Sequence, residues 1–132
     1  MISQTPRYAL HILGHLAGTG DHLVPGDEIA KATGVPSNYL SKILSQLRKS
    51  GLVEARKGWG GGFRLREGAG ERPIRDVVAA IDGIDSTERS DCAFGLPACD
   101  ASRPCPLHPS WEKIRDAYEE MLRSTRIADL AR

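Results

Sequence analysis

The residues best suited to chemistry lie in one short stretch of the sequence. All three cysteines and one of the four histidines fall within CAFGLPACDASRPCPLH, with the spacing C-x6-C-x5-C-x2-H. The candidate metal ligands are Cys92, Cys99, Cys105 and His108. Three thiolates and an imidazole form a four-donor set, and a loop without regular structure lets them converge on one centre. Its prolines stiffen the loop and reduce the entropy lost on closing it around a metal.

Length and composition limit what this stretch can serve. The chain has 132 residues, 40% apolar and 27% charged, as in one globular domain with its own core. It has no run of about 18 apolar residues and no secretory signal at its start. We therefore expect a cytoplasmic protein that does not enter membranes, with its thiols reduced. An odd number of cysteines favours metal binding or thiol chemistry over structural disulfides.

The charge of the chain is unevenly distributed. The segment from Ser37 to Arg66 holds seven basic residues and a single acid, Glu54, and so carries +6. Since the whole chain carries +1, the remainder carries −5. A concentrated basic segment on a nearly neutral chain indicates a polyanionic partner, and we expect nucleic acid.

The elements around this segment predict a DNA-binding motif. Apolar residues at helical spacing predict helices over 6–17, 26–33 and 38–50, with Thr5 and Ser37 as N-caps of the first and third. The second and third helices, joined by a short turn, predict a helix-turn-helix. A helical hairpin in an unrelated bundle has the same spacing, so the residues that follow decide between the two.

A hairpin follows the third helix directly. Residues 52–57 and 63–66 alternate weakly around the turn GWGGG, which predicts a β-hairpin with a glycine-rich tip. In this position the hairpin is the wing of a winged helix, whose tip can enter a minor groove while cations reach phosphates. A nucleotide-binding loop is the rival interpretation, but the turn lacks the Gly-Lys-Ser/Thr ending.

The predicted DNA contacts lie on the third helix and on the wing. Asn38 is suited to a bidentate pair with adenine, and Ser41 to any base edge. Tyr39 is either a phosphate contact or a partly buried anchor, while Arg48 and Lys49 hold phosphates. The full set is Ser37, Asn38, Tyr39, Ser41, Lys42, Arg48, Lys49, Arg56, Lys57, Trp59, Gly60 and Arg64.

The second half of the chain is expected to support dimerisation. After a linker, Pro73 opens a helix that ends near Ile81, and a longer helix runs from about Ser110 to Ser124 with a coiled-coil-like apolar seam. A homodimer would match a palindromic double-stranded DNA site. We therefore predict a mainly α fold with a small β-hairpin. Residues 1–72 form the winged helix-turn-helix, and residues 73–132 hold the loop 92–108 and the dimerisation helix.

This order of parts resembles the family of winged-helix iron–sulfur transcription regulators that includes IscR and NsrR. The matching segments are RYAL (7–10), NYLSKILSQLRKSGLV (38–53), GGGFRL (61–66), the cysteine stretch with CPLH (105–108), and Trp111. The resemblance implies a dimeric bacterial regulator, by expectation a repressor, whose DNA affinity depends on an iron–sulfur cluster that senses redox state, nitric oxide or cluster supply. Relatives often carry proline where this chain has Trp59, which would stack on a sugar edge or lie over Arg56.

The resemblance also bears on the cluster type. An IscR-like pattern makes His108 the fourth ligand of a [2Fe–2S] cluster. An NsrR-like pattern takes an aspartate from the partner's first helix for a [4Fe–4S] cluster, and the matching residue here is Arg7, which cannot ligate. This favours [2Fe–2S], with [4Fe–4S] as the alternative and His11 as another first-helix donor. The first cysteine gap is one residue longer than is common in the family.

Other interpretations of the cysteines remain open. They could form a structural Cys3His zinc site, or a metal-free set of redox-sensing thiols in a regulator without a cluster. A small redox enzyme is disfavoured, since the sequence has no CxxC motif and no cofactor fingerprint. We therefore expect that the protein is not an enzyme.

Overall fold

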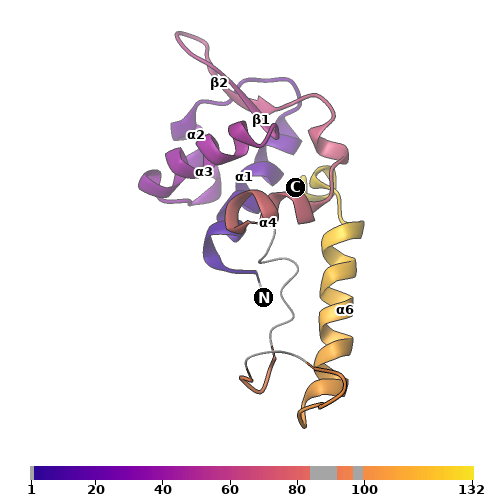
Figure 1. Ribbon diagram of the computed structural model, residues 1–132. Helices are drawn as coiled ribbons and strands as arrows, with labels where there is room; N and C mark the ends of the chain where they lie inside the picture. Colours follow the sequence, from indigo (N-terminus) through magenta and orange to yellow (C-terminus); the bar gives the residue numbers. More distant parts are fainter. Residues whose placement is uncertain (1, 84–91, 97–99) are drawn as a thin grey trace.

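The N-terminal half of the chain folds as helices followed by a hairpin. The computed structural model describes residues 2–83, 92–96 and 100–132. Its first elements are α1 (Gln4–Thr19), α2 (Gly26–Thr33), α3 (Ser37–Lys49), β1 (Val53–Arg56) and β2 (Gly62–Leu65) (Figure 1). The two strands form an antiparallel sheet. The predicted helix-turn-helix and the hairpin behind it are therefore confirmed.

The C-terminal half adds one long helix that stands apart from the rest. The elements are the 3-10 turn η1 (Ala69–Glu71), α4 (Ile74–Asp82), α6 (His108–Ser124) and the 3-10 turn η2 (Ile127–Leu130). In Figure 1, α6 runs downward from the body of the molecule, and residues 92–96 and 100–107 lie at its lower end. The helix thus separates the winged helix-turn-helix from Cys92 and Cys105.

The core is built around α1, which packs against α2, α3, α4, β2 and η2. Ile12, Leu13 and Leu16 are fully buried on one face of α1. Because residues three and four positions apart lie on the same side of a helix, this spacing gives α1 one apolar face. From α6, in contrast, the apolar core of the described residues takes only Leu122.

The predicted N-caps are wrong by one or two residues. Helix α1 begins at Gln4, and the hydroxyl of Ser3 donates to Asp82 at 3.0 Å instead of accepting from the first turn. Thr5 therefore lies inside the first turn, where proline is also tolerated because its missing N–H would have no partner. Helix α3 has Pro36 as its N-cap, so Ser37 is its first residue.

The hairpin is fixed to the body at its base. Val53 pairs with Leu65 and Arg56 with Gly62. Beside β2, the backbones of Val24 and Phe63 exchange two hydrogen bonds, of 2.8 and 2.9 Å. Gly62 has φ +150°, and a Cβ there would lie 2.6 Å from the carbonyl of Val24. Only glycine allows this close approach, which sets the direction of the wing.

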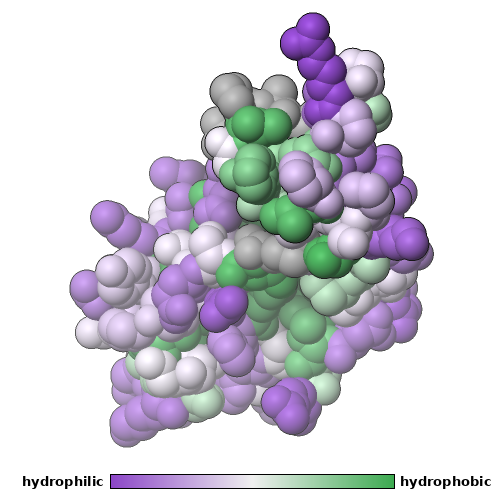
Figure 2. Space-filling view, turned by 90° about the horizontal axis from the view of Figure 1, so that it is seen from below, coloured by the Kyte–Doolittle hydropathy of each residue, from purple (hydrophilic) through white to green (hydrophobic). Residues whose placement is uncertain are grey.

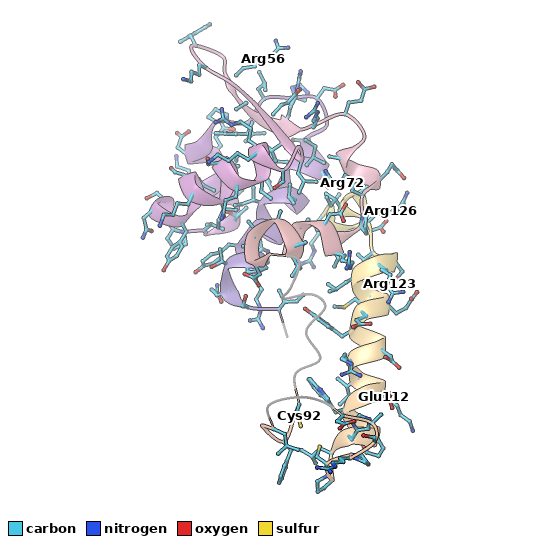
Figure 3. All side chains as sticks on the ribbon, viewed as in Figure 1. Arg56, Arg72, Cys92, Glu112, Arg123 and Arg126 are labelled. Carbon is cyan, nitrogen blue, oxygen red and sulfur yellow. The ribbon has the colours of Figure 1, made fainter. Side chains whose placement is uncertain are left out.

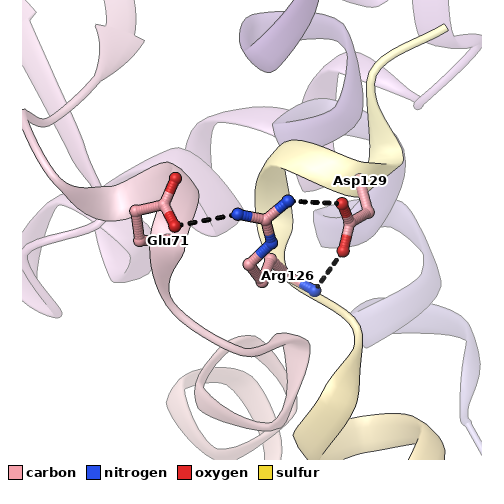
Figure 4. A network of polar contacts seen from close by, with 3 residues as sticks. All are labelled: Glu71, Arg126 and Asp129. Atoms are coloured by element: carbon pink, nitrogen blue, oxygen red, sulfur yellow. Dashed lines mark hydrogen bonds and ion pairs between the residues drawn. The ribbon is translucent and has the colours of Figure 1, made fainter.

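The upper end of α6 is tied to the segment that follows the wing. The N–H of Ile74 donates to the Thr125 carbonyl and the N–H of Ile127 donates to the Arg72 carbonyl, both at 2.9 Å. The Arg126 guanidinium bridges Glu71 at 2.9 Å and Asp129 at 3.1 Å (Figure 4). The pKa of the Asp129 carboxyl is lowered, chiefly by the hydrogen bond from the backbone N–H of Arg126 and further by the one from the Arg126 side chain.

Leu122 should be the residue that holds α6 on the body. It is 1% exposed, so Leu122→Ala should lower the free energy of unfolding by about 2–5 kcal/mol. The same substitution at Leu107, which is 46% exposed at the other end of the helix, should change it by less than about 0.5 kcal/mol. Denaturant unfolding at fixed protein concentration measures both. Equal losses would show that α6 is not anchored through Leu122.

Candidate nucleic-acid interface and thiol site

The recognition helix presents its predicted contacts to solvent. Ser37, Asn38, Ser41 and Lys42 are exposed on the first two turns of α3. The opposite side of the helix buries Leu40, Ile43, Leu44 and Leu47. The apolar stripe therefore fixes which face of α3 is available to a partner, and the polar residues chosen from the sequence lie on that face.

A groove joins this helix to the wing. It has a volume of about 400 Å³ and lies between α3 and the hairpin. Its polar lining includes Ser41, Ser45 and Arg48 from α3, and Arg56 and Lys57 from the hairpin. Four cations of this region form no ion pair with any residue that the structure describes: Arg48, Lys49, Arg56 and Lys57. Unpaired cations on both walls of one groove are suited to a phosphate backbone.

Two of the predicted contacts are already engaged within the protein. Arg64 pairs with Glu54 across the hairpin and donates to the Asp21 carbonyl at 3.2 Å, with 24% of its side chain exposed. The ring of Tyr39 packs on Tyr8 of α1, with the ring centroids 5.8 Å apart. The Arg64 contact was missed from the sequence, although Glu54 is the single acid of the basic segment and lies opposite Arg64 in the hairpin register.

The described part of the cysteine stretch brings two candidate ligands together. The Sγ atoms of Cys92 and Cys105 are 3.7 Å apart, and both residues are half-buried. Two thiolates bound to one tetrahedral metal at about 2.3 Å would be about 3.8 Å apart. The pair therefore fits a shared metal centre. Cys99 lies outside the described residues.

The backbone around Cys92 favours its thiolate form. The pKa of the Cys92 thiol is lowered, first by the backbone N–H of Leu96 and further by those of Phe94 and Gly95 and by the Cys105 thiol, against an opposing effect of burial. Gly95, at φ +93°, lets the chain turn back toward the sulfur. The thiolate is the form that binds metals and reacts with oxidants. A glycine three residues after Cys92 was the sequence signal for this turn.

His108 lies close to the cysteine pair along the chain. It is the first residue of α6, is 8% exposed, and its backbone N–H donates to the Cys105 carbonyl at 3.1 Å. Its Nε2 lies 3.8 Å from Glu112 Oε2 one turn along. Cys92 and Glu112 both lie at the lower end of the molecule, with Arg56 at the wing (Figure 3). Within the described residues, no three histidines, cysteines or acids form a metal-binding group, so His108 as a ligand stays a prediction.

A helix-turn-helix with a glycine-tipped wing, unpaired cations and a separate thiol pair defines the class of winged-helix regulators. The chain belongs to the Rrf2 family, described as iron-dependent transcriptional regulators, and matches it over residues 2–132. This confirms the resemblance to IscR-type regulators. Members of this family bind DNA and are typically dimeric. The expectation that the chain is not an enzyme agrees with its membership.

Individual relatives support the same assignment. The chain is 32% identical to the transcriptional regulator IscR of Photobacterium profundum, over 96% of this chain and 72% of that protein. The structure superposes on CymR, the global cysteine regulator of B. subtilis, with a TM-score of 0.78 and 29% identity over 99% and 95% of the two chains. The oxidized form of Staphylococcus aureus CymR superposes with a TM-score of 0.74 and 26% identity, over 99% of this chain and 95% of that one.

Among the described residues, no helix is long and apolar enough to cross a bilayer.

Proposed function

We propose that this protein is a homodimeric transcription regulator, a repressor, whose affinity for a palindromic DNA site is controlled by an iron–sulfur cluster. The ligands would be Cys92, Cys99 and Cys105, with His108 as the fourth, and [2Fe–2S] as the cluster type. The observation that carries the proposal is the pair of sulfur atoms 3.7 Å apart, of which that of Cys92 faces backbone N–H groups that favour its thiolate form. Such a cluster, when bound, reacts with oxidants or nitric oxide.

The DNA would lie across the groove between α3 and the wing. The first turns of α3 offer Asn38 and Ser41 to base edges, and Lys42 to phosphate. Arg48 and Arg56 line opposite walls of the groove and would hold phosphates on either side. A DNA partner also implies the cytoplasm as the working compartment.

The long helix connects the two proposed sites. His108 begins α6 beside Cys105, and the other end of α6 leads into η2, where the N–H of Ile127 donates to the Arg72 carbonyl. Arg72 in turn donates to the carbonyl of Ser50, which caps the recognition helix, at 3.3 Å. This contiguous set of contacts supports a route by which a change at the thiols alters the position of α3.

The first experiment is a visible absorption spectrum of anaerobically purified protein, with iron and acid-labile sulfide assayed on the same sample. Matched iron and sulfide of about two per chain would support [2Fe–2S], and about four would support [4Fe–4S] with another fourth ligand. Colourless protein that contains zinc would make the site a structural Cys3His centre. Protein with neither metal would overturn the cluster proposal and leave a winged-helix DNA-binding protein.

A thiol switch without a cluster is the second candidate. The separation of 3.7 Å between Cys92 and Cys105 is short enough for the two thiols to form a disulfide on oxidation, with loss of two protons and two electrons to an oxidant such as hydrogen peroxide. The oxidized form of CymR among the structural relatives is consistent with this chemistry. Mass spectrometry of the metal-free protein after peroxide treatment would detect the bond, and its absence would exclude this candidate.

The cations on the groove should set the salt dependence of DNA binding. For a duplex selected by the protein from a random library, Arg48→Gln should weaken binding on all sequences alike. It should also reduce the slope of log affinity against log salt by about 0.9 per contact, or roughly two in a dimer. Arg123→Gln on α6 is the matched control, because Arg123 pairs with Glu119 away from the groove. Fluorescence anisotropy measures both, and an unchanged slope for Arg48→Gln would remove Arg48 from the interface.

A further inference from the structure

The tip of the wing carries an aromatic side chain that the fold does not use. Trp59 is fully exposed, at 105%, whereas the other exposed large apolar side chains of the described residues lie between 41% and 59%. An exposed fraction this large excludes packing over Arg56, one of the two alternatives expected from the sequence. The hairpin reaches beyond the helices at its tip (Figure 1), so no other element of the described chain covers the indole.

The tip is a defined turn that holds this side chain outward. The N–H of Gly61 donates to the Gly58 carbonyl at 3.0 Å, which places Trp59 and Gly60 at the centre of a four-residue turn. Gly60 has φ +78°, the conformation that a type II turn requires at its third position. A Cβ on Gly61 would lie 2.2 Å from the Arg56 carbonyl, so the strand passes too close for any larger residue. The indole is therefore presented by an ordered turn.

The surroundings of Trp59 identify its partner. Arg56 and Lys57 precede the turn, are exposed, and form no ion pair with a described residue. Both line the groove shared with the recognition helix. A flat apolar group flanked by unpaired cations fits a partner that offers phosphates outside and stacked planar rings inside, which is duplex DNA.

We propose that Trp59 is a wedge that enters the minor groove and stacks on a partly opened base step, so that the wing selects deformable DNA. This inference rests on the proposed DNA-binding function. Pyrimidine–purine steps open more easily than A-tracts, so the wedge would favour sites with such a step under the wing tip. Stacking of one base on an aromatic ring is worth about tenfold to hundredfold in affinity.

The test uses the full-length protein and duplexes selected from a random library. Binding is measured for wild type, Trp59→Ala and Trp59→Phe on the selected duplex, and on a version whose step under the wing is replaced by an A-tract. The chain has two tryptophans, so Trp111→Phe isolates the emission of Trp59 and Trp59→Phe isolates that of Trp111. Circular dichroism checks folding, which should not change because Trp59 is fully exposed.

We expect Trp59→Ala to lose about tenfold or more on the selected duplex and little on the A-tract version, with Trp59→Phe in between. DNA should quench the Trp59 emission in the Trp111→Phe protein. Equal losses of affinity by Trp59→Ala on both duplexes would mean that the indole stacks on the sugar edge, and would overturn the wedge. Unchanged affinity of Trp59→Ala, or Trp59 emission that DNA does not change, would overturn it as well. If wild-type protein selects no duplex, the proposed function itself fails, and that outcome is distinct from a failure of the wedge alone.

Discussion

Replacing Cys105 by alanine should remove all bound iron and sulfide from the protein and abolish its visible absorption. Cys105 supplies one of the two sulfur atoms that the structure places 3.7 Å apart, so the variant leaves Cys92 without its neighbour. A cluster held by three cysteines and a histidine has no fourth cysteine in the chain that could replace Cys105. The loss is therefore expected to be complete in anaerobically purified protein, measured by iron and sulfide content.

The fold should survive this substitution. Cys105 is half-buried and does not belong to the hydrophobic core. Ser102→Ala is the matched control, because Ser102 lies in the same stretch and, among the described residues, its hydroxyl donates to Asp100 alone, at 2.6 Å. The control should keep iron, and Cys105→Ala should unfold at the denaturant concentration of metal-free wild-type protein, because only the stabilisation by the bound cluster is lost. Full iron retention by Cys105→Ala would contradict the assignment of this residue as a ligand.

The helices and the wing were predictable because their signals are periodic or steric. The stripe of Leu40, Ile43, Leu44 and Leu47 repeats with the helical period and is buried as expected. The glycine-rich turn between two alternating segments predicts a tight connection between two strands. The helix caps were less predictable, because the Ser3 hydroxyl is taken by Asp82, a residue 79 positions away. Local sequence rules do not include such partners.

The thiol site shows the same limit more strongly. The four-donor set was evident from residue types and spacing, but a loop has no period from which distances follow. Only the structure shows that Cys92 lies close to Cys105 and that backbone N–H groups surround the Cys92 sulfur. The same holds for the contact between His108 and Glu112. On the wing, likewise, the sequence predicts Arg64 as a DNA contact, whereas the structure pairs it with Glu54 across the hairpin.

The long helix leaves an apolar face that the rest of the described chain does not cover. On α6, Ile114 is 50% exposed and Met121 is 41% exposed, seven residues apart on one stripe. The adjoining edge of the same apolar face turns Tyr118 and Leu122 to the body, where burial, followed by the charge of Asp82, raises the pKa of Tyr118. Seen from the lower end of the molecule, hydrophobic side chains gather in the middle of the face, with hydrophilic ones around them (Figure 2). A second copy of α6 would cover this stripe.

Ile114→Glu should therefore convert the protein from dimer to monomer. In a two-fold interface the variant buries one unpaired carboxylate from each subunit, and each costs about 3 kcal/mol or more, so the dissociation constant should rise by more than a hundredfold. Lys113→Glu, on the neighbouring exposed position, changes the charge further and should leave the dimer intact if the apolar stripe forms the interface. Sedimentation equilibrium at several concentrations distinguishes them. Because two half-sites must be bound together, the monomeric variant should also bind the selected palindrome no better than it binds a single half-site. A dimer that persisted in Ile114→Glu would place the contact between the subunits elsewhere on the chain.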